Sequence, residues 1–553
     1  MRITRLVAAL LVAAYGSGCG GKQGGAGDVA ADLPPPGLDA STPPADAVVD
    51  QTSRGLDART PPPDGDEIVG DEGGVTDTGT DPALPDLDAR TPPPDGDEIV
   101  GDEGGVPDVA APRTPGALKT AAEAGDAEGL EALMAAYDGP LCDAVECVVV
   151  VKITDHDAVA IRGDWNAWAE EAMHASPLPD WFWATVPVAV LDGCAGYKLY
   201  ADGDWFRDPM HRWIRFSDVA VNSALCPPGE SRIALVEGVY SPQLDNQRSV
   251  YVYVPAPAFE DPAATFPVLY MQDGFNVFTN PMAPFGHWAA DATTDALVAA
   301  GAVEPPIIVG IDTQDRMNEY LYTDITIDIG NGPKTITPLL PEYAEFVVDT
   351  VKPMVDAQFP TRPGREDTGI AGSSLGGISS LWIAWFHADT FGRVASFSGS
   401  YWVGQDDSGT EGHPTMESLL AAAAPTPDQL ALKVYMDSGT DEGMGDTGLA
   451  YTGDSRCYTD WTRNALLALG WDNRAEWDDD GSLATPPADF PPESDPDLVP
   501  TLYWHDTPPA EYDGWDDWLE PSHNLLHLVG DGHAHNEAAW AARFPAMLRF
   551  LYP

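Results

Sequence analysis

The fold of this chain is decided by one stretch, Gly369-Ile370-Ala371-Gly372-Ser373-Ser374-Leu375-Gly376-Gly377. The apolar run Ile378–Phe386 follows it and predicts a helix. The stretch contains a G-x-S-x-G pattern centred on Ser374, which is typical of a serine on a sharp turn from a strand into a helix. Glycine flanks the serine because strand and helix approach too closely there for a Cβ atom. We therefore expect Ser374 to be a nucleophile, with the N–H of Leu375 directed at any oxyanion formed beside it.

Two later segments supply acidic and imidazole side chains in the order that such a serine requires, first the acid and then the histidine. The strand-like run Leu432–Met436 ends in an acidic loop that contains Asp441 and Glu442. A loop before the last amphipathic helix contains His533 and His535. The pattern predicts a Ser/acid/His triad, and the residues alone leave two candidates for each partner.

A second oxyanion donor is expected after an earlier strand. The buried strand-like run Phe266–Met271 ends in Gln272-Asp273-Gly274-Phe275. A glycine at the end of a strand lets the backbone turn an N–H toward a neighbouring site. We expect this donor to be the N–H of Gly274 or Phe275.

Residues 248–552 resemble the putative-esterase branch of the α/β-hydrolases, which includes enterochelin esterases, feruloyl esterases and related carbohydrate esterases. The matching segments are Arg248–Pro255, Val268–Phe278, Ile307–Ile311, Arg316–Tyr320, Gly372–Gly377, Phe391–Trp402, Gly439–Glu442 and His535–Trp540. The resemblance implies a mostly parallel sheet with helices on both faces and a reaction that needs no cofactor or metal. It also implies that Ser374 is the nucleophile, His535 the general base and Glu442 the acid. His535 is favoured over His533 because Trp540 follows it at the family's spacing, and Asp441 is the alternative acid.

Side chains for substrate binding are expected in the matched segments and in an insertion. The matched segments offer Arg316, Glu319 and Trp402. The insertion, roughly Trp471–Ser522, includes Trp515 and Trp518 and is expected to form a wall of the cleft beside His535. Its acidic run Asp478–Gly481 lacks the spacing of a known calcium loop, so no metal site is predicted.

The first 115 residues carry targeting and tethering signals rather than a core. Arg2 and Arg5, the apolar run Leu6–Tyr15 and Gly16-Ser17-Gly18-Cys19 resemble a bacterial lipoprotein signal. Cys19 is therefore the expected lipidation site, and a cleaved signal with a free cysteine is the alternative. Residues 20–115 are rich in Pro, Gly, Asp and Ala, and Leu56–Val75 recurs identically as Leu87–Val106. This composition predicts a disordered acidic tether.

Residues 116–140 are expected to contain a short amphipathic helix, Ala117–Tyr137, and residues 141–227 a separate module. Its short strand-like runs with turns between them predict an immunoglobulin-like β-sandwich. The segments Ile161–Trp168 and Tyr197–Trp205 resemble early-set, glycogen-binding-type modules, in which Trp165, Trp168 and Trp205 could bind sugar or pack in the core. Four cysteines bracket this module and predict two disulfides of open pairing: Cys142, Cys147, Cys194 and Cys226.

The sequence as a whole predicts an exported enzyme with an α/β-hydrolase domain at 228–553, preceded by a signal at 1–19. The expected activity is serine carboxylic-ester hydrolysis of an aromatic-acyl, siderophore-type or carbohydrate-linked ester. An acyltransferase of the same fold and an inactive surface binding protein are the alternatives. The net charge of -60 excludes nucleic acid as a partner, because phosphates need Lys and Arg. A lipid anchor in the outer membrane is the expected location, with secretion as the alternative.

Overall fold

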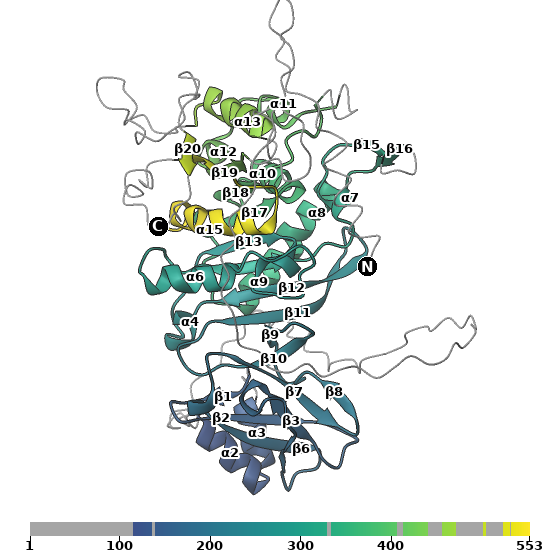
Figure 1. Ribbon diagram of the computed structural model, residues 1–553, viewed down its shortest axis with the longest axis vertical. Coiled ribbons are helices and arrows are strands. Elements are labelled where there is room, and N and C mark those ends of the chain that lie inside the picture. The colour runs from purple at the N-terminus through teal and green to yellow at the C-terminus, as the bar shows by residue number, and fades with distance from the viewer. Residues whose placement is uncertain are drawn as a thin grey trace, which may run out of the picture. The chain divides into compact units, whose positions relative to one another are not determined.

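A computed structural model describes residues 114–134, 139–328, 333–405, 413–440, 456–471, 501–504, 524–530 and 532–553 (Figure 1). Several predicted features lie outside these residues. They are Cys19, the tether, both acid candidates Asp441 and Glu442, the acidic run Asp478–Gly481, and the tryptophans Trp515 and Trp518. No helix in the described part of the chain is long and apolar enough to cross a membrane.

The N-terminal region consists of two helices followed by short antiparallel strands. The helices are α2 (Pro115–Ala124) and α3 (Ala127–Met134). The strands are β1 (Leu141–Cys142), β2 (Glu146–Lys152), β3 (Ala160–Gly163), β4 (Glu171–Ala172), β5 (His174–Ala175), β6 (Trp181–Pro187), β7 (Ala195–Ala201), β8 (Asp204–Phe206), β9 (Trp213–Phe216) and β10 (Val221–Leu225). Inward-facing residues of β2 and β6 in one sheet share a core with those of β3 and β7 in another. The predicted short strands are therefore present and form two facing sheets.

The single helix expected over Ala117–Tyr137 is two helices. Gly125 ends α2 in the left-handed conformation, with φ 65°, which reverses the chain before α3. Leu118 and Leu130 pack against Val148 and Trp183, on the face of the β2–β6 sheet opposite the shared core.

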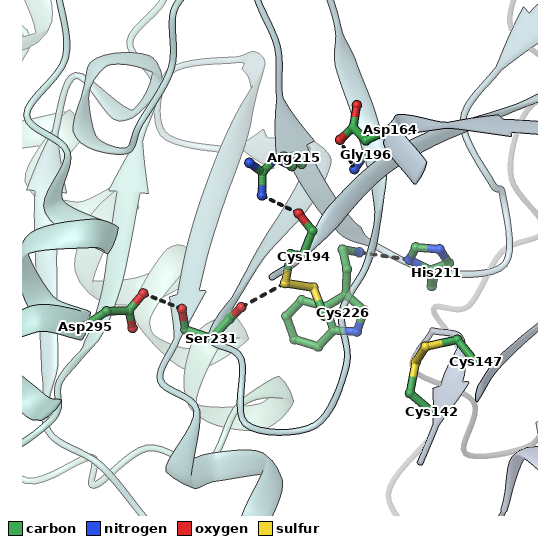
Figure 2. Close-up of a disulfide and its surroundings, with 11 residues drawn as sticks. Cys142, Cys147, Asp164, Cys194, Gly196, His211, Arg215, Cys226, Ser231 and Asp295 are labelled. Atoms are coloured by element: carbon green, nitrogen blue, oxygen red, sulfur yellow. Dashed lines mark hydrogen bonds between the residues drawn. A yellow bond between two sulfur atoms is a disulfide. The ribbon is translucent and has the colours of Figure 1, made fainter. Parts of the chain in front are cut away.

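Two disulfides form in this region, as predicted, and the structure supplies their pairing. Cys142 bonds to Cys147, and Cys194 bonds to Cys226. Arg215 donates a hydrogen bond to the backbone carbonyl of Cys194 beside the second bridge (Figure 2). The first bridge joins the ends of the β1–β2 hairpin, and the second links the start of β7 to the end of β10.

The remaining residues form an α/β domain. Its strands are β11 (Arg232–Ser241), β12 (Asn246–Val254), β13 (Val268–Gln272), β14 (Ile307–Ile311), β15 (Ile325–Asp328), β16 (Pro333–Ile336), β17 (Thr368–Ser373), β18 (Arg393–Phe397), β19 (Lys433–Gly439), β20 (Thr501–Trp504) and β21 (Leu525–Gly530). Its helices are α4 (Pro257–Glu260), α5 (Gly274–Val277), α6 (Ala290–Ala299), α7 (Arg316–Glu319), α8 (Leu340–Phe346), α9 (Lys352–Gln358), α10 (Leu375–Phe386), α11 (Met416–Leu420), α12 (Pro427–Leu430), α13 (Arg456–Ala468) and α15 (Glu537–Leu551).

In this domain the sheet runs in the order β20-β21-β19-β18-β17-β13-β14-β12-β11, and it continues from β11 into the N-terminal strands through β9. All neighbours from β20 to β14 pair in parallel, and β12 and β11 add on antiparallel. Alternate residues of a strand pack on opposite faces, so Tyr270 belongs to the core with α8 and α10, and Leu269 to the core with α6 and α15. Helices therefore cover both faces, and the predicted α/β-hydrolase architecture is confirmed.

Candidate active site

The turn at Ser374 has the geometry that the sequence predicts. Ser374 lies between β17 and α10 with φ 57° and ψ −123°, a conformation that L-residues rarely adopt. Hydrogen bonds on both sides hold this strained residue: its N–H donates to the carbonyl of Phe397 at 2.9 Å, and its carbonyl accepts the N–H of Gly377 at 3.0 Å. Ser374 is partly exposed, whereas its neighbour Ser373 is buried. The turn therefore exposes Ser374 and buries Ser373.

Close packing explains why glycine flanks this serine. A Cβ atom on Gly372 would lie 2.6 Å from the carbonyl oxygen of Gly376 and 2.7 Å from Cγ of Gln272. Such a contact is too short for any other residue, so the elbow depends on glycine at this position.

The first N–H groups of α10 are free to bind an oxyanion. In the part of the chain that the structure describes, the N–H groups of Leu375 and Gly376 donate to no acceptor. They lie at the N-terminus of a twelve-residue helix, where the backbone dipole favours a negative charge. Leu375 thus occupies the predicted position beside the nucleophile.

The two residues proposed for the second oxyanion donor differ in their contacts. The N–H of Phe275 donates to Oδ1 of Asp312 at 2.8 Å, so it is not available to an oxyanion and the prediction for Phe275 is corrected. The N–H of Gly274 has no acceptor among the described residues. A Cβ on Gly274 would lie 2.7 Å from the backbone carbon of Gly310, which shows how closely this turn packs on β14. Gly274 remains the candidate donor.

Arg316 lies next to the elbow, as its predicted role requires. Its Nε and Nη2 donate to the two oxygens of Asp273 at 2.7 and 2.9 Å, and Nη2 also approaches the carbonyl of Ser373 at 3.3 Å. The guanidinium is about one-third exposed, at 36%. Arg316 therefore joins the turn after β13 to the strand that carries the nucleophile.

Glu319, three residues later, does not have the predicted role. Its carboxylate is buried at 1% exposure and accepts two hydrogen bonds from Arg248, at 2.8 and 2.9 Å. A carboxylate held in this way stabilises the position of α7 on β12 and is closed to a substrate. This contact could not be predicted from the sequence, because the partner lies on a distant strand.

Trp402 and Ser400 follow β18 close to the nucleophile. Oγ of Ser400 lies 3.3 Å from Oγ of Ser374, and Trp402, two residues further on, is partly buried. Ser400 was not singled out from the sequence. Its position after a parallel strand adjacent to β17 is the signal that could have identified it, because carboxyl ends of parallel strands meet at one edge.

The histidine loop lies between β21 and α15. The ring of His535 packs edge-to-face on Trp540, with centroids 5.1 Å apart, and is partly exposed. Nδ1 of the alternative histidine, His533, lies 3.3 Å from Nη1 of the buried Arg543. Both histidines therefore contact side chains of α15, and the choice of His535 as general base stays a prediction.

Glu537, at the first position of α15, is a site residue that the sequence analysis missed. It interacts electrostatically with Asp273, Arg316 and His535, and Nδ2 of Asn276 approaches its Oε1 at 3.5 Å. Burial, together with the charge of Asp273, raises the pKa of Glu537 to about 7. These interactions place the start of α15 beside the turn after β13.

Asp437 is another carboxylate near this edge, and its described contacts join α15 to β19. It is fully buried, and both of its oxygens accept hydrogen bonds from Arg543, at 2.9 and 3.1 Å. Tyr435 donates to the same carboxylate at 2.8 Å. Within the described residues, no group of three or more His, Cys, Asp or Glu side chains could hold a metal ion.

The sheet order, the strained serine and the histidine loop together define an α/β-hydrolase with a serine nucleophile elbow. Residues 241–458 match the family described as "Putative esterase". The matched region includes Ser374 and the strands around it, and this similarity supports carboxylic ester hydrolysis as the class of activity.

Individual relatives are more distant. The chain is 22% identical over 214 residues to the uncharacterized protein YbbA of Bacillus subtilis, covering 38% of this chain and 74% of YbbA. It is 28% identical over 276 residues to the iron(III) enterobactin esterase of Dickeya dadantii, covering 45% of this chain and 55% of that protein. The chain thus spans about half the length of the enterobactin esterase. A solved ferulic acid esterase structure aligns over 58% of this chain and 98% of its own, with 17% identity and a TM-score of 0.37.

Proposed function

We propose that this protein is an exported serine carboxylic-ester hydrolase that acts through Ser374, His535 and an acid. The observation that carries the proposal is the conformation of Ser374, a partly exposed serine strained at the start of α10. The N–H groups of Leu375 and Gly376 beside it have no acceptor among the described residues. Backbone strain of this kind persists only where the surrounding structure holds it, and it concentrates at functional sites.

The reaction follows from these positions. Oγ of Ser374 attacks the ester carbonyl carbon while His535 takes its proton. The tetrahedral oxyanion accepts hydrogen bonds from the N–H groups of Leu375 and Gly274. The intermediate collapses, His535 returns the proton to the departing alcohol, and water then cleaves the acyl-enzyme by the same steps. Glu442 is the proposed acid that orients the imidazole, with Asp441 as the alternative.

The substrate that we propose is an aromatic-acyl, siderophore-type or carbohydrate-linked ester. The names of two similar proteins support this class, an iron(III) enterobactin esterase and a ferulic acid esterase. Trp402, which follows the Ser400 that contacts Ser374, supports it as well, since aromatic faces bind planar acyl groups and sugar rings alike. Trp515 and Trp518 would add further aromatic surface. Transfer of the acyl group to an acceptor other than water is the second candidate function.

The N-terminal parts extend the proposal to location and domain organisation. We infer that residues 141–227 are an early-set β-sandwich, because two facing sheets share a core there. Trp205 is 45% exposed, and its ring centroid lies 6.2 Å from that of Trp168. Trp165 instead packs toward the core residue Tyr197. A signal at 1–19, lipidation of Cys19 and an acidic tether at 20–115 would anchor the enzyme to the outer membrane.

Ser374→Ala tests the proposal directly. We expect kcat for a chromogenic ester, a feruloyl ester and a catecholate ester to fall on the order of 10⁴-fold or more, because the covalent step is lost. Ser373→Ala is the matched control, since it alters the neighbouring buried serine. A fluorophosphonate probe should label the wild type and Ser373→Ala on the Ser374 peptide, and should not label Ser374→Ala. Turnover by a folded Ser374→Ala variant would contradict the proposed nucleophile.

A further inference from the structure

The short segment after β18 connects α15, the helix that follows the histidine loop, to Ser374. It consists of Ser398, Gly399 and Ser400. Ser398 is fully buried and has a φ of 45°, and its N–H donates to the carbonyl of Asp437 at 3.0 Å. A Cβ on Gly399 would lie 2.5 Å from the ring of Tyr401. The segment is therefore held tightly by its neighbours.

The hydroxyl of Ser398 accepts hydrogen bonds from two side chains of α15. Nε1 of Trp540 donates at 3.0 Å and Nη2 of Arg543 donates at 2.9 Å. Arg543 is itself fixed by the paired hydrogen bonds to Asp437 on β19. One oxygen atom thus joins two residues of α15 to the segment after β18.

The same segment contacts the nucleophile directly. The N–H of Ser400 donates to the carbonyl of Ser374 at 2.9 Å, and its Oγ lies 3.3 Å from Oγ of Ser374. On the helix side, the indole of Trp540 packs against the imidazole of His535 at an interplanar angle of 83°. A continuous set of contacts therefore runs from His535 through Trp540 and Ser398 to Ser400 and Ser374.

We propose that Ser398 is a positioning residue, whose hydroxyl fixes the imidazole of His535 relative to Oγ of Ser374. This inference rests on the proposed function, because it assumes that these two residues exchange the proton. Transfer of a proton between them requires hydrogen-bond reach, and a displacement of about 1 Å can cost on the order of 100-fold in rate. Ser398 does not contact the substrate, so its effect should appear in kcat rather than in KM.

Ser398→Ala is the main test. It removes the hydroxyl that accepts hydrogen bonds from Trp540 and Arg543, and we expect kcat to fall about 10- to 100-fold with KM changed less than about twofold. The pH profile of kcat should also shift, because the environment of the general base changes. Trp540→Phe removes one donor and keeps an aromatic ring beside His535, so it should give a smaller loss of kcat in the same direction.

Two further variants separate positioning from loss of structure. Ser223→Ala is the matched control, since this buried serine accepts a backbone N–H from Asp208 at 2.8 Å in the N-terminal region. It should lower the melting temperature without altering the kinetics of the folded fraction. Ser398→Gly removes the same hydroxyl and suits the positive φ, so it replaces Ser398→Ala if that variant does not fold.

The outcomes distinguish this inference from the proposed function. If the wild type hydrolyses esters and Ser374→Ala does not, the proposed function stands. Normal kcat and an unchanged pH profile in folded Ser398→Ala or Ser398→Gly would then overturn the role of Ser398 alone. If the Ser398 variants only reduce the fraction of folded enzyme and leave kcat per folded molecule unchanged, as expected for Ser223→Ala, the positioning role of Ser398 would also be overturned.

Discussion

Asp312 shows how one half-buried carboxylate shapes the turn that faces the nucleophile. It follows β14, accepts the N–H of Phe275 and is approached by the hydroxyl of Tyr251 at 3.3 Å. Burial raises its pKa from 3.8 to about 6, although both hydrogen bonds oppose the shift. A carboxyl whose pKa is raised by folding favours the folded state below its unfolded pKa. It loses that contribution as the pH rises through about 6.

Asp312→Asn should therefore change stability in a pH-dependent way. The amide oxygen still accepts the N–H of Phe275, but the half-buried charge is gone. We expect the melting temperature of the variant, relative to the wild type, to rise between pH 5 and pH 8. Calorimetry at several pH values measures this difference, with the exposed Asp218→Asn as control. A difference that is constant with pH, or that falls, would contradict the assigned ionisation of Asp312.

At the scale of elements, the position of α15 depends on a buried ion pair. Arg543 and Asp437 are both fully buried, and the pair joins the helix that follows the histidine loop to the sheet at β19. Breaking one member leaves a charge in a low-dielectric interior, whereas replacing both removes that cost.

Arg543→Met should accordingly lower the free energy of unfolding by about 3–5 kcal/mol, and adding Asp437→Leu should recover part of the loss. A double-mutant cycle of denaturant unfolding gives the coupling energy between the two positions. Arg549→Met, in the last turn of the same helix, is the control and should cost much less. If the effects of Arg543→Met and Asp437→Leu on the free energy of unfolding simply add, the ion pair does not hold α15 in position.

At the scale of the molecule, two disulfides close loops of very different length in the N-terminal region. Cys142 and Cys147 are separated by 5 positions, and Cys194 and Cys226 by 32. A disulfide stabilises mainly by restricting the unfolded chain, and the longer loop is restricted more.

Replacing the long-range pair, Cys194→Ala with Cys226→Ala, should cost about 4 kcal/mol, and replacing the short-range pair about 2 kcal/mol. Thermal unfolding of the two double variants beside the wild type tests this order. The ester-hydrolysing site should be unaffected in the folded fraction, because neither bridge contacts it. An equal loss for both pairs would mean that native-state contacts, rather than loop closure, set their contributions.

Features that depend on local backbone geometry could be predicted from the amino-acid sequence. The spacing of Gly372, Ser374 and Gly376 predicted the strained turn, because few other patterns allow a serine between a strand and a closely packed helix. Apolar runs such as Phe266–Met271 predicted the buried strands, and together with the order of the motifs they indicated the α/β fold.

Features that depend on partners far along the chain could not be predicted from the sequence. Glu319 looked available in sequence, but Arg248, 71 positions away, buries it in an ion pair. Phe275 was a predicted oxyanion donor, but its N–H donates a hydrogen bond to Asp312. The pairing of the cysteines and the link from Trp540 to Ser398, 142 positions apart, are of the same kind. Local periodicity in the sequence predicts on which face of a strand or helix a side chain lies. The contacts that the side chain makes on that face depend on which strands and helices pack together.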